Sequence, residues 1–252
     1  MDRDLVLEEL AGNAWPARAT ARIDGWLLRH TSGVASRRVN SARTPLTESA
    51  SRPFAEVEPA LRAFYSQRHA ARAVIQVSPI ERHAELDADL AERGYAREAA
   101  VDVLTAPVAE LTALPGRSER QIMIEPVTPA WARTLARLSA HEDRPELFEQ
   151  VLGRIAPASA CFAVSTPEGL AAVALAVVER GWLGLLCMVT ATRWRRRGYA
   201  TALLAAAGRW GVSRDCDQAY LQVHEANTAA QRLYRNAGFE RSHGYHYRVA
   251  PL

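Results

Sequence analysis

The sequence predicts an α/β protein built from two units of comparable length. The chain has 252 residues, which is more than a single domain usually holds. Hydrophobic residues make up 48% of it, which is enough to form two cores. Apolar runs of strand length alternate with runs of helix length. In the second half the order becomes strand, glycine-containing loop, helix, strand, helix, strand, which is typical of an α/β fold.

The first unit is expected to end near Leu111. Pro59 is expected to begin a helix, because proline suits the first helical position, and Gly94 is expected to end another. A turn through Ser32 and Gly33 is expected to join two strands. The predicted helices cover 5–13, 59–68 and 85–93, and the predicted strands cover 23–29, 35–41, 74–78 and 99–105.

Turn-forming residues separate the two predicted units. Residues 112–120 include Pro115-Gly116-Arg117-Ser118, which has the chemistry of a linker. We therefore expect one domain over 1–111, a linker over 112–120 and a second domain over 121–252. In the second domain, strands are expected at 122–125, 160–165, 170–178, 182–189 and 219–224, and helices at 129–141, 145–154, 201–212 and after Asn227.

The charge pattern gives no reason to expect a nucleic-acid partner. The formal net charge is +3, and the 31 basic residues, all of them arginine, are interleaved with 28 acidic residues. Only Arg193, Arg195, Arg196 and Arg197 cluster, whereas nucleic-acid binding needs a basic stripe or a recognisable module. The lysine-free composition is typical of a GC-rich genome rather than of a particular function.

Nothing in the sequence indicates a membrane, a disulfide framework or a metal. No apolar run reaches the roughly 18 residues that cross a bilayer, and the start of the sequence, Met1-Asp-Arg-Asp, is charged and acidic rather than signal-like. Cys161, Cys187 and Cys216 are widely spaced and include no C-x-x-C pair. We expect a cytoplasmic protein, monomeric or homodimeric, whose cysteines are small core residues.

An anion-binding loop is predicted between the strand that ends at Val189 and the helix that begins near Gly198. The loop reads R195-R-R-G-Y-A200. The first amides of a helix have no partner within it and lie at the positive end of its dipole, so an anion docks there. Gly198 and the small Ala200 allow the anion to approach the backbone closely. A pyrophosphate is the expected ligand.

This loop resembles a hallmark of the GNAT superfamily of acyl-CoA N-acetyltransferases, R/Q-x-x-G-x-G/A, which Arg195, Gly198 and Ala200 match. A solvated basic turn is the alternative. The resemblance implies acetyl-CoA as the cofactor, with loop amides on the pyrophosphate and backbone groups of the strand end on the pantetheine arm. The implied cofactor-binding residues are Met188, Val189, Thr190, Arg195, Arg196, Arg197, Gly198, Tyr199, Ala200, Thr201, Asn227 and Ala230. Guanidinium groups at 195–197 also suit the 3′-phosphate, and the sequence leaves open which of them binds it.

A second stretch resembles the other GNAT hallmark, N-x-x-A-x-x-L-Y-x-x-x-G-F. The matching residues are Asn227, Ala230, Leu233, Tyr234, Gly238 and Phe239. Asn227 is expected to cap the helix and Gly238 to end it. The resemblance implies that Tyr234 lies beside the thioester sulfur and protonates the departing thiolate. The alternative is a half-buried core aromatic residue.

The general base is less well defined. Relatives that act on protein N-termini often carry an acid in the preceding strand, where this chain has Gln222, which cannot accept a proton. We name Glu225, beside Tyr234, as a catalytic candidate. His224 is adjacent in sequence, and Glu142 lies where the substrate-side helices of the family supply carboxylates. An ordered water chain would serve equally well. Tyr245, His246 and Tyr247 on the last strand either line the acceptor pocket or pack in the core.

The first unit has a weaker resemblance. W26-L-L-R29 and S36-R-R-V-N-S41 are similar to bacterial tandem GNAT proteins, and Arg29, Arg38 and Asn40 suit either a substrate-side or interface function or a plain surface. The resemblance implies two GNAT-like α/β domains, each with a mixed, largely antiparallel sheet flanked by helices. The second would contain a splayed strand pair. The first would be degenerate, because it lacks the arginine-glycine loop.

The sequence therefore predicts an acetyltransferase that moves acetyl from acetyl-CoA directly to a primary amine in a ternary complex. A small molecule, such as an amino acid derivative or an antibiotic, is the preferred acceptor, because an added domain can wall off an open cleft. N-terminal or side-chain acetylation of a peptide or protein is one alternative. A non-catalytic acyl-CoA sensor is the other.

Overall fold

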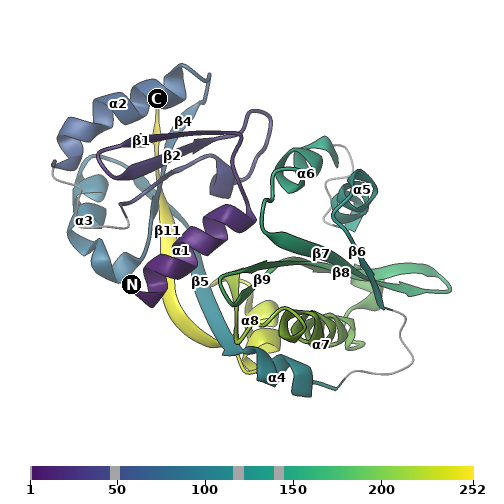
Figure 1. The fold of residues 1–252 in the computed structure, drawn as a ribbon. Coiled ribbons are helices and arrows are strands. Elements are labelled where there is room, and N and C mark those ends of the chain that lie inside the picture. Colours follow the sequence, from purple (N-terminus) through teal and green to yellow (C-terminus); the bar gives the residue numbers. More distant parts are fainter. Residues whose placement is uncertain (1, 46–51, 116–121, 139–144) are drawn as a thin grey trace. The chain divides into compact units, whose positions relative to one another are not determined.

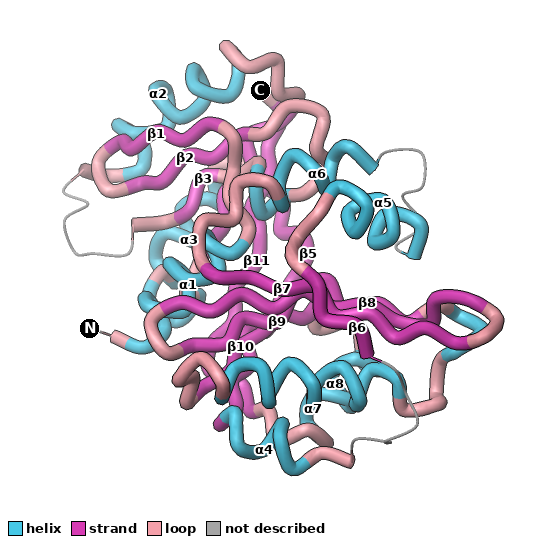
Figure 2. Tube along the Cα trace, turned by 45° about the vertical axis from the view of Figure 1, so that its right-hand side comes forward, coloured by secondary structure: helices cyan, strands magenta, loops and turns pink. Residues whose placement is uncertain are grey.

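The structure is a computed structural model that describes residues 2–45, 52–115, 122–138 and 145–252. Eleven strands hydrogen-bond in the order β1-β2-β3-β4-β11-β5-β10-β9-β8-β7-β6, flanked by helices (Figures 1 and 2). This is the mixed α/β fold, with a mostly antiparallel sheet, that the sequence predicts. None of the helices in the described ranges is both long and apolar enough to cross a membrane.

The residues divide into two compact units. Unit 1 comprises Met1–Asp102, His224–Ala226 and His243–Leu252, and unit 2 comprises Val103–Val223 and Asn227–Ser242. Each unit thus contains strand residues from the other half of the chain. The last strand, β11 (Glu240–Pro251), pairs antiparallel with β4 (Arg72–Val77) of unit 1, and β5 (Ala96–Pro107) passes from unit 1 into unit 2. The predicted boundaries at residues 111 and 121 divide the chain into two consecutive segments, whereas each compact unit includes strand residues from both segments.

Unit 1 packs its helices around a small apolar core that includes Leu28, Leu61, Ile75 and Leu90. Its helices are α1 (Arg3–Ala14), α2 (Phe54–Ser66) and α3 (Ala84–Glu92), with short 3₁₀ turns η1 (Arg37–Val39) and η2 (Ile80–Arg82). Its remaining strands are β1 (Ala19–Ile23), β2 (Trp26–His30) and β3 (Ala42–Arg43). Gly94 follows α3 with φ +81°, as predicted for a residue that ends a helix.

The first hairpin differs from its prediction. β1 and β2 are joined by Asp24 and Gly25, both with positive φ, in the two-residue turn that Asp-Gly favours. The predicted strand 23–29 therefore spans a turn. The predicted strand 35–41 is wrong as well, because η1 occupies it. The Asn40 side chain accepts from the Thr31 amide at 2.8 Å and donates to the Val34 carbonyl at 2.6 Å, which holds this segment as a compact loop.

Pro59 does not begin a helix, contrary to the prediction. Helix α2 begins at Phe54, after Pro53, and Pro59 lies inside it. A proline at this position gives up one backbone bond, the one to the carbonyl four residues earlier. The buried side chains of Val57, Leu61 and Tyr65 hold the helix against unit 1, and their burial outweighs the lost bond.

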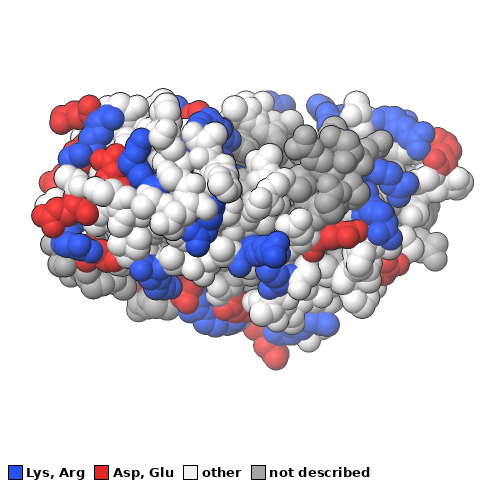
Figure 3. Space-filling model, turned by 90° about the horizontal axis from the view of Figure 1, so that it is seen from above, with Lys and Arg blue, Asp and Glu red and all other residues white. Residues whose placement is uncertain are grey.

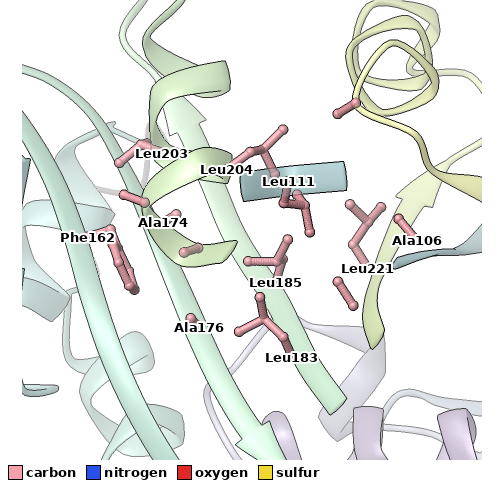
Figure 4. Close-up of a cluster of buried hydrophobic side chains, with 14 of the residues drawn as sticks. Ala106, Leu111, Phe162, Ala174, Ala176, Leu183, Leu185, Leu203, Leu204 and Leu221 are labelled. Carbon is pink, nitrogen blue, oxygen red and sulfur yellow. The ribbon is translucent and has the colours of Figure 1, made fainter. Parts of the chain in front are cut away.

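Unit 2 is the larger compact unit, and its core is shown in Figure 4. Leu183 and Leu185 from the sheet meet Leu203 and Leu204 from a helix there (Figure 4). Its helices are α4 (Val108–Ala113), α5 (Pro129–Leu138), α6 (Pro145–Leu152), α7 (Tyr199–Val212) and α8 (Thr228–Arg235), with a 3₁₀ turn η3 (Thr192–Trp194). Its strands, besides its share of β5 and β11, are β6 (Ile122–Glu125), β7 (Ala158–Thr166), β8 (Gly169–Glu179), β9 (Trp182–Thr190) and β10 (Gln218–His224).

Helix α4 replaces the start of the predicted linker. Thr112 and Ala113 lie in it, and residues 116–120 of the predicted linker fall outside the described ranges. The helix packs against α7 so closely that a Cβ added to Gly208 would lie 2.7 Å from the Cβ of Leu111. Short helices are hard to predict because six residues contain too little periodicity to identify one.

Candidate active site

The parallel strands β9 and β10 separate part of the way along their length. They pair over four positions, from Gln218 with Trp182 to Leu221 with Leu185. Their pairing ends there, although the two strands continue to Thr190 and His224 within the described residues. On its other edge β9 stays paired with β8 as far as Thr190. Beyond Leu185, therefore, β9 is paired in the sheet with β8 and no longer with β10.

A β-bulge accompanies this separation. The register between β8 and β9 shifts between Val173 and Leu175, opposite Leu186 to Val189. Cys187 lies in this segment with φ +52°, a left-handed conformation that is uncommon for a residue other than glycine. Bulges bend a strand and increase its twist, so the bulge at Cys187 explains why β9 turns away from β10. The apolar run of β9 gives no sequence signal of it.

The loop after β9 leads to the start of α7, as predicted. Gly198 is the residue before the helix and has φ +74°, a conformation that glycine adopts without strain. The first helical hydrogen bond joins the Ala202 amide to the Gly198 carbonyl at 3.1 Å. The amides of Ala200 and Thr201 precede this bond at the positive end of the helix, where an anion docks.

The arginines of this loop have different surroundings. Arg193 donates to the Glu168 carbonyl at 2.9 Å, and the Arg195 Nε donates to the Thr190 carbonyl at 3.4 Å. The guanidinium of Arg197 lies 4.8 Å from the ring centre of Trp194, a buried residue whose ring also meets Tyr199 edge-on. The cluster is exposed, so its charge is available to an anionic ligand.

Helix α8 follows the predicted capping pattern. The Asn227 side chain accepts from the Ala230 amide at 3.1 Å, which satisfies one of the free donors at the helix start. Ala230 and Leu233 are partly buried against the core of unit 2. Gly238 ends the helix with φ +85°, and the Cβ of an alanine there would lie 3.0 Å from the Cβ of Glu110 on α4.

Tyr234 lies on the inner side of α8, in the same apolar cluster as Leu185 of β9 and Leu221 of β10. It is 8% exposed, and its ring meets Phe239 edge-on at 5.8 Å between centroids. Burial raises the pKa of Tyr234 to about 12. Its hydroxyl makes no hydrogen bond with any residue in the described ranges. The phenol is therefore protonated at neutral pH and can act as a proton donor.

The candidate bases lie at the surface. His224 and Glu225 are exposed where β10 ends, and the Glu225 amide donates to the Ala100 carbonyl at 3.0 Å. Gln222 is half-buried. Glu142 lies outside the described residues.

The remaining candidate residues lie in unit 1, and their side chains contact other residues of that unit. Tyr245, His246 and Tyr247 are buried, as expected for the core alternative, and the His246 Nε2 lies 2.6 Å from an Asp87 oxygen. Arg29 is also buried and donates to Ser41 and Gln76 at 2.7 and 2.6 Å. The guanidinium of Arg38 lies 4.6 Å from the ring centre of Trp15.

Charge on the visible surface is mixed. On the face shown in Figure 3, basic and acidic side chains alternate and do not gather into one basic patch. Cys161 and Cys216 are buried, as expected, whereas Cys187 is partly exposed and is not the core residue that was predicted. None of the three forms a disulfide within the described ranges.

Comparisons with known proteins agree with this geometry. Residues 5–248 match the family described as "Probable histone acetyltransferase Rv0428c C-terminal". The chain is 27% identical to the uncharacterized N-acetyltransferase YobR of Bacillus subtilis, over 99% of both proteins. It also resembles the GCN5-related N-acetyltransferase from Kribbella flavida, with a TM-score of 0.72 and 15% identity over 100% of this chain and 97% of that one.

A tandem GNAT protein from the clavulanic acid biosynthesis pathway has the same fold, with a TM-score of 0.71 and 15% identity over 97% of this chain and 87% of that one. At this identity the two structural likenesses concern the fold alone. The family match covers nearly the whole chain and includes both hallmark stretches. The chain belongs to the family described as the C-terminal region of the probable histone acetyltransferase Rv0428c, and it is a GNAT-type N-acetyltransferase.

Proposed function

We propose that this enzyme transfers an acetyl group from acetyl-CoA to a primary amine of a small molecule, directly and within a ternary complex. The observation that carries the proposal is the separation of β9 and β10 beside the start of α7. It places a segment of β9 that β10 no longer pairs with next in the chain to the first amides of α7. An extended pantetheine arm and a pyrophosphate require these two kinds of backbone donor and acceptor.

The proposed binding residues follow from these two features. Met188, Val189 and Thr190 would pair with the amide groups of the pantetheine arm through their backbones. Gly198 to Thr201 would bind the pyrophosphate, and the exposed arginines nearby would balance its charge. Asn227 and Ala230 would support the site indirectly, since the cap fixes the start of α8, which carries Tyr234.

Acetyl-CoA supplies the acetyl group as a thioester. The amine nitrogen forms a bond to the carbonyl carbon, the bond from carbon to sulfur breaks, and Tyr234 donates its proton to the sulfur as the thiol leaves. The amine loses one proton, which Glu225 would accept through water, and the phenol regains its proton from solvent. A tyrosine with a pKa near 12 is a donor at neutral pH and cannot serve as the base.

Replacing Tyr234 by Phe tests this role. Phe keeps the ring contact with Phe239 and removes only the hydroxyl, so the fold and acetyl-CoA affinity should be preserved. General acid catalysis contributes roughly 10²–10⁴-fold, and we expect kcat to fall within that range. The measurement is free-thiol release from acetyl-CoA with an amine panel of amino acids, aminoglycosides and polyamines. An unchanged kcat in the variant would refute the acid role.

The family description favours a second acceptor class, a protein lysine, and one experiment separates the two. This enzyme contains no lysine, so any acetyl-lysine formed in a reaction with a histone or a lysine peptide must lie on the acceptor. We expect thiol release with one class of small amine and little acetyl-lysine signal. Strong acetyl-lysine signal on the peptide, with silence across the small amines, would establish the protein acceptor instead.

A further inference from the structure

The four clustered arginines of the α7 loop differ in what their side chains already contact. Arg193 and Arg195 donate to backbone carbonyls, and Arg197 stacks on Trp194. Arg196 is exposed and makes no hydrogen bond, ion pair or ring contact with any residue in the described ranges. Arg196 therefore has all of its guanidinium donors open to a ligand.

The backbone also singles out Arg196. Its φ is +63°, in the left-handed region that non-glycine residues seldom occupy. The residues on both sides are held in place, Arg195 through the Thr190 carbonyl and Arg197 through the Trp194 ring. A strained residue between two anchored neighbours has a fixed Cα, so its side chain leaves the loop in a defined direction.

We propose that Arg196 binds the 3′-phosphate of the cofactor and makes the enzyme selective for CoA over its dephosphorylated form. The inference rests on the proposed function, since it assumes that the pyrophosphate docks at the start of α7, on the amides of Ala200 and Thr201. The 3′-phosphate lies one ribose away from that pyrophosphate and has a charge of nearly −2 at neutral pH. A free guanidinium two residues before Gly198, on a long side chain, suits this dianion through two parallel hydrogen bonds.

The alternative is that Arg196 binds the pyrophosphate itself. Comparing CoA with dephospho-CoA distinguishes these two possibilities. A pyrophosphate contact is present in both CoA and dephospho-CoA, so its loss would weaken both equally. A 3′-phosphate contact is present only in CoA, so its loss would weaken CoA alone.

The test compares four proteins: the wild type, Arg196→Ala, Arg196→Lys and the control Arg209→Ala, which changes an exposed arginine within α7. For each, the KM of acetyl-CoA and of acetyl-dephospho-CoA is measured, together with the Kd of CoA and dephospho-CoA by calorimetry. We expect Arg196→Ala to weaken the binding of CoA about tenfold and to leave the Kd of dephospho-CoA unchanged, and we expect Arg196→Lys to restore part of the lost affinity. The control should match the wild type with both cofactors.

If Arg196→Ala weakens the binding of CoA and dephospho-CoA equally, the proposal is overturned in favour of a pyrophosphate contact. If the affinity for neither falls, Arg196 does not contact the cofactor. The calorimetry separates this result from the proposed function. If the wild type binds CoA more tightly than dephospho-CoA but releases no thiol with any amine, the proposed acceptor fails while the role of Arg196 stands. Competition by 3′,5′-ADP against 5′-ADP gives the same comparison without the acyl arm.

Discussion

At the scale of single residues, Gly198 is the position where an unusual backbone conformation and the proposed cofactor binding coincide. Its φ of +74° is strained for any other L-residue, and a changed loop would misdirect the amides that follow. We predict that Gly198→Ala destabilises the fold by about 1 kcal/mol and raises the KM of acetyl-CoA at least tenfold. Urea unfolding and thiol-release kinetics measure the two effects.

Gly94 offers a matched control for this prediction. It has φ +81°, and a Cβ there would meet nothing within 4 Å. Gly94→Ala should therefore cost similar stability while leaving the KM of acetyl-CoA unchanged. A similar rise of KM in both variants would mean that general destabilisation, and not the loop, weakens the cofactor.

A buried ion pair in unit 1 predicts a pH dependence of stability. Glu8 and His243 are each 1% exposed, and their side chains approach to 2.9 Å. Burial by itself lowers the pKa of His243, but the hydrogen bond and charge of Glu8 and the charge of Asp4 outweigh it, so the pKa is raised. Burial raises the pKa of Glu8, but the bond from His243 and the charges of Arg43 and His243 reverse this, so the pKa is lowered.

The sign of the effect follows from these directions. The contribution of His243 is complete below pH 6.5 and is lost as pH rises through its raised folded pKa. That of Glu8 is present above pH 4.5 and is lost as pH falls through its lowered folded pKa. We predict that His243→Gln costs about 3 kcal/mol between these two pH values and progressively less towards alkaline pH.

Urea unfolding from pH 5 to pH 9 measures this difference. His69→Asn is the control, because His69 is exposed with positive φ, which asparagine tolerates. If the loss of unfolding free energy in His243→Gln is the same at every pH, the packing of the two side chains, and not their charges, stabilises the pair.

At the scale of elements, helix α4 packs so closely against α7 that Gly208 has no room for a larger side chain. Replacing a helical glycine by alanine ordinarily stabilises a helix by about 1 kcal/mol. At Gly208 the new Cβ would lie 2.7 Å from the Cβ of Leu111, so we predict the opposite sign, a loss of about 1–3 kcal/mol. The urea midpoint of Gly208→Ala, with the exposed neighbour Arg209→Ala as control, measures it. A raised midpoint would mean that α4 does not press on α7.

At the scale of the whole molecule, the exchange of β5 and β11 predicts that the two halves of the chain do not fold apart. Unit 2 contains Val103–Pro107 of β5 beside β10, together with α4, which places Leu104 and Leu111 in its core. We predict that residues 121–252 expressed alone are unfolded and do not bind acetyl-CoA. Circular dichroism and calorimetry test this.

The complementary experiment cuts the chain without removing anything. A protease site inserted within residues 116–120 divides the polypeptide, and each compact unit still receives its strands from both fragments. We expect the cut protein to elute as one species and to retain thiol release. Separation of the fragments, or an active 121–252 fragment, would instead support the linear division at residues 111 and 121.

Features that depend on a few neighbouring residues could be predicted from the sequence. Asn227 and Gly238 bound α8, Gly198 precedes α7 and Gly94 ends α3, because caps and left-handed turns use local backbone chemistry. The same local logic failed where a signal was misassigned, at the Asp24-Gly25 turn, or was overridden by packing, at Pro59. Both hallmark stretches of the acetyltransferase family could be recognised in the sequence because each is a short local pattern.

Features that depend on distant parts of the chain became clear only from the folded structure. The pairing of β11 with β4, the separation of β9 from β10 at the Cys187 bulge, and the distribution of loop arginines between Trp194, backbone carbonyls and solvent belong to this class. Strand partners are chosen by the burial of whole faces, and the residues that meet are far apart in sequence. A linear sequence contains the preference of each strand but not which neighbour satisfies it.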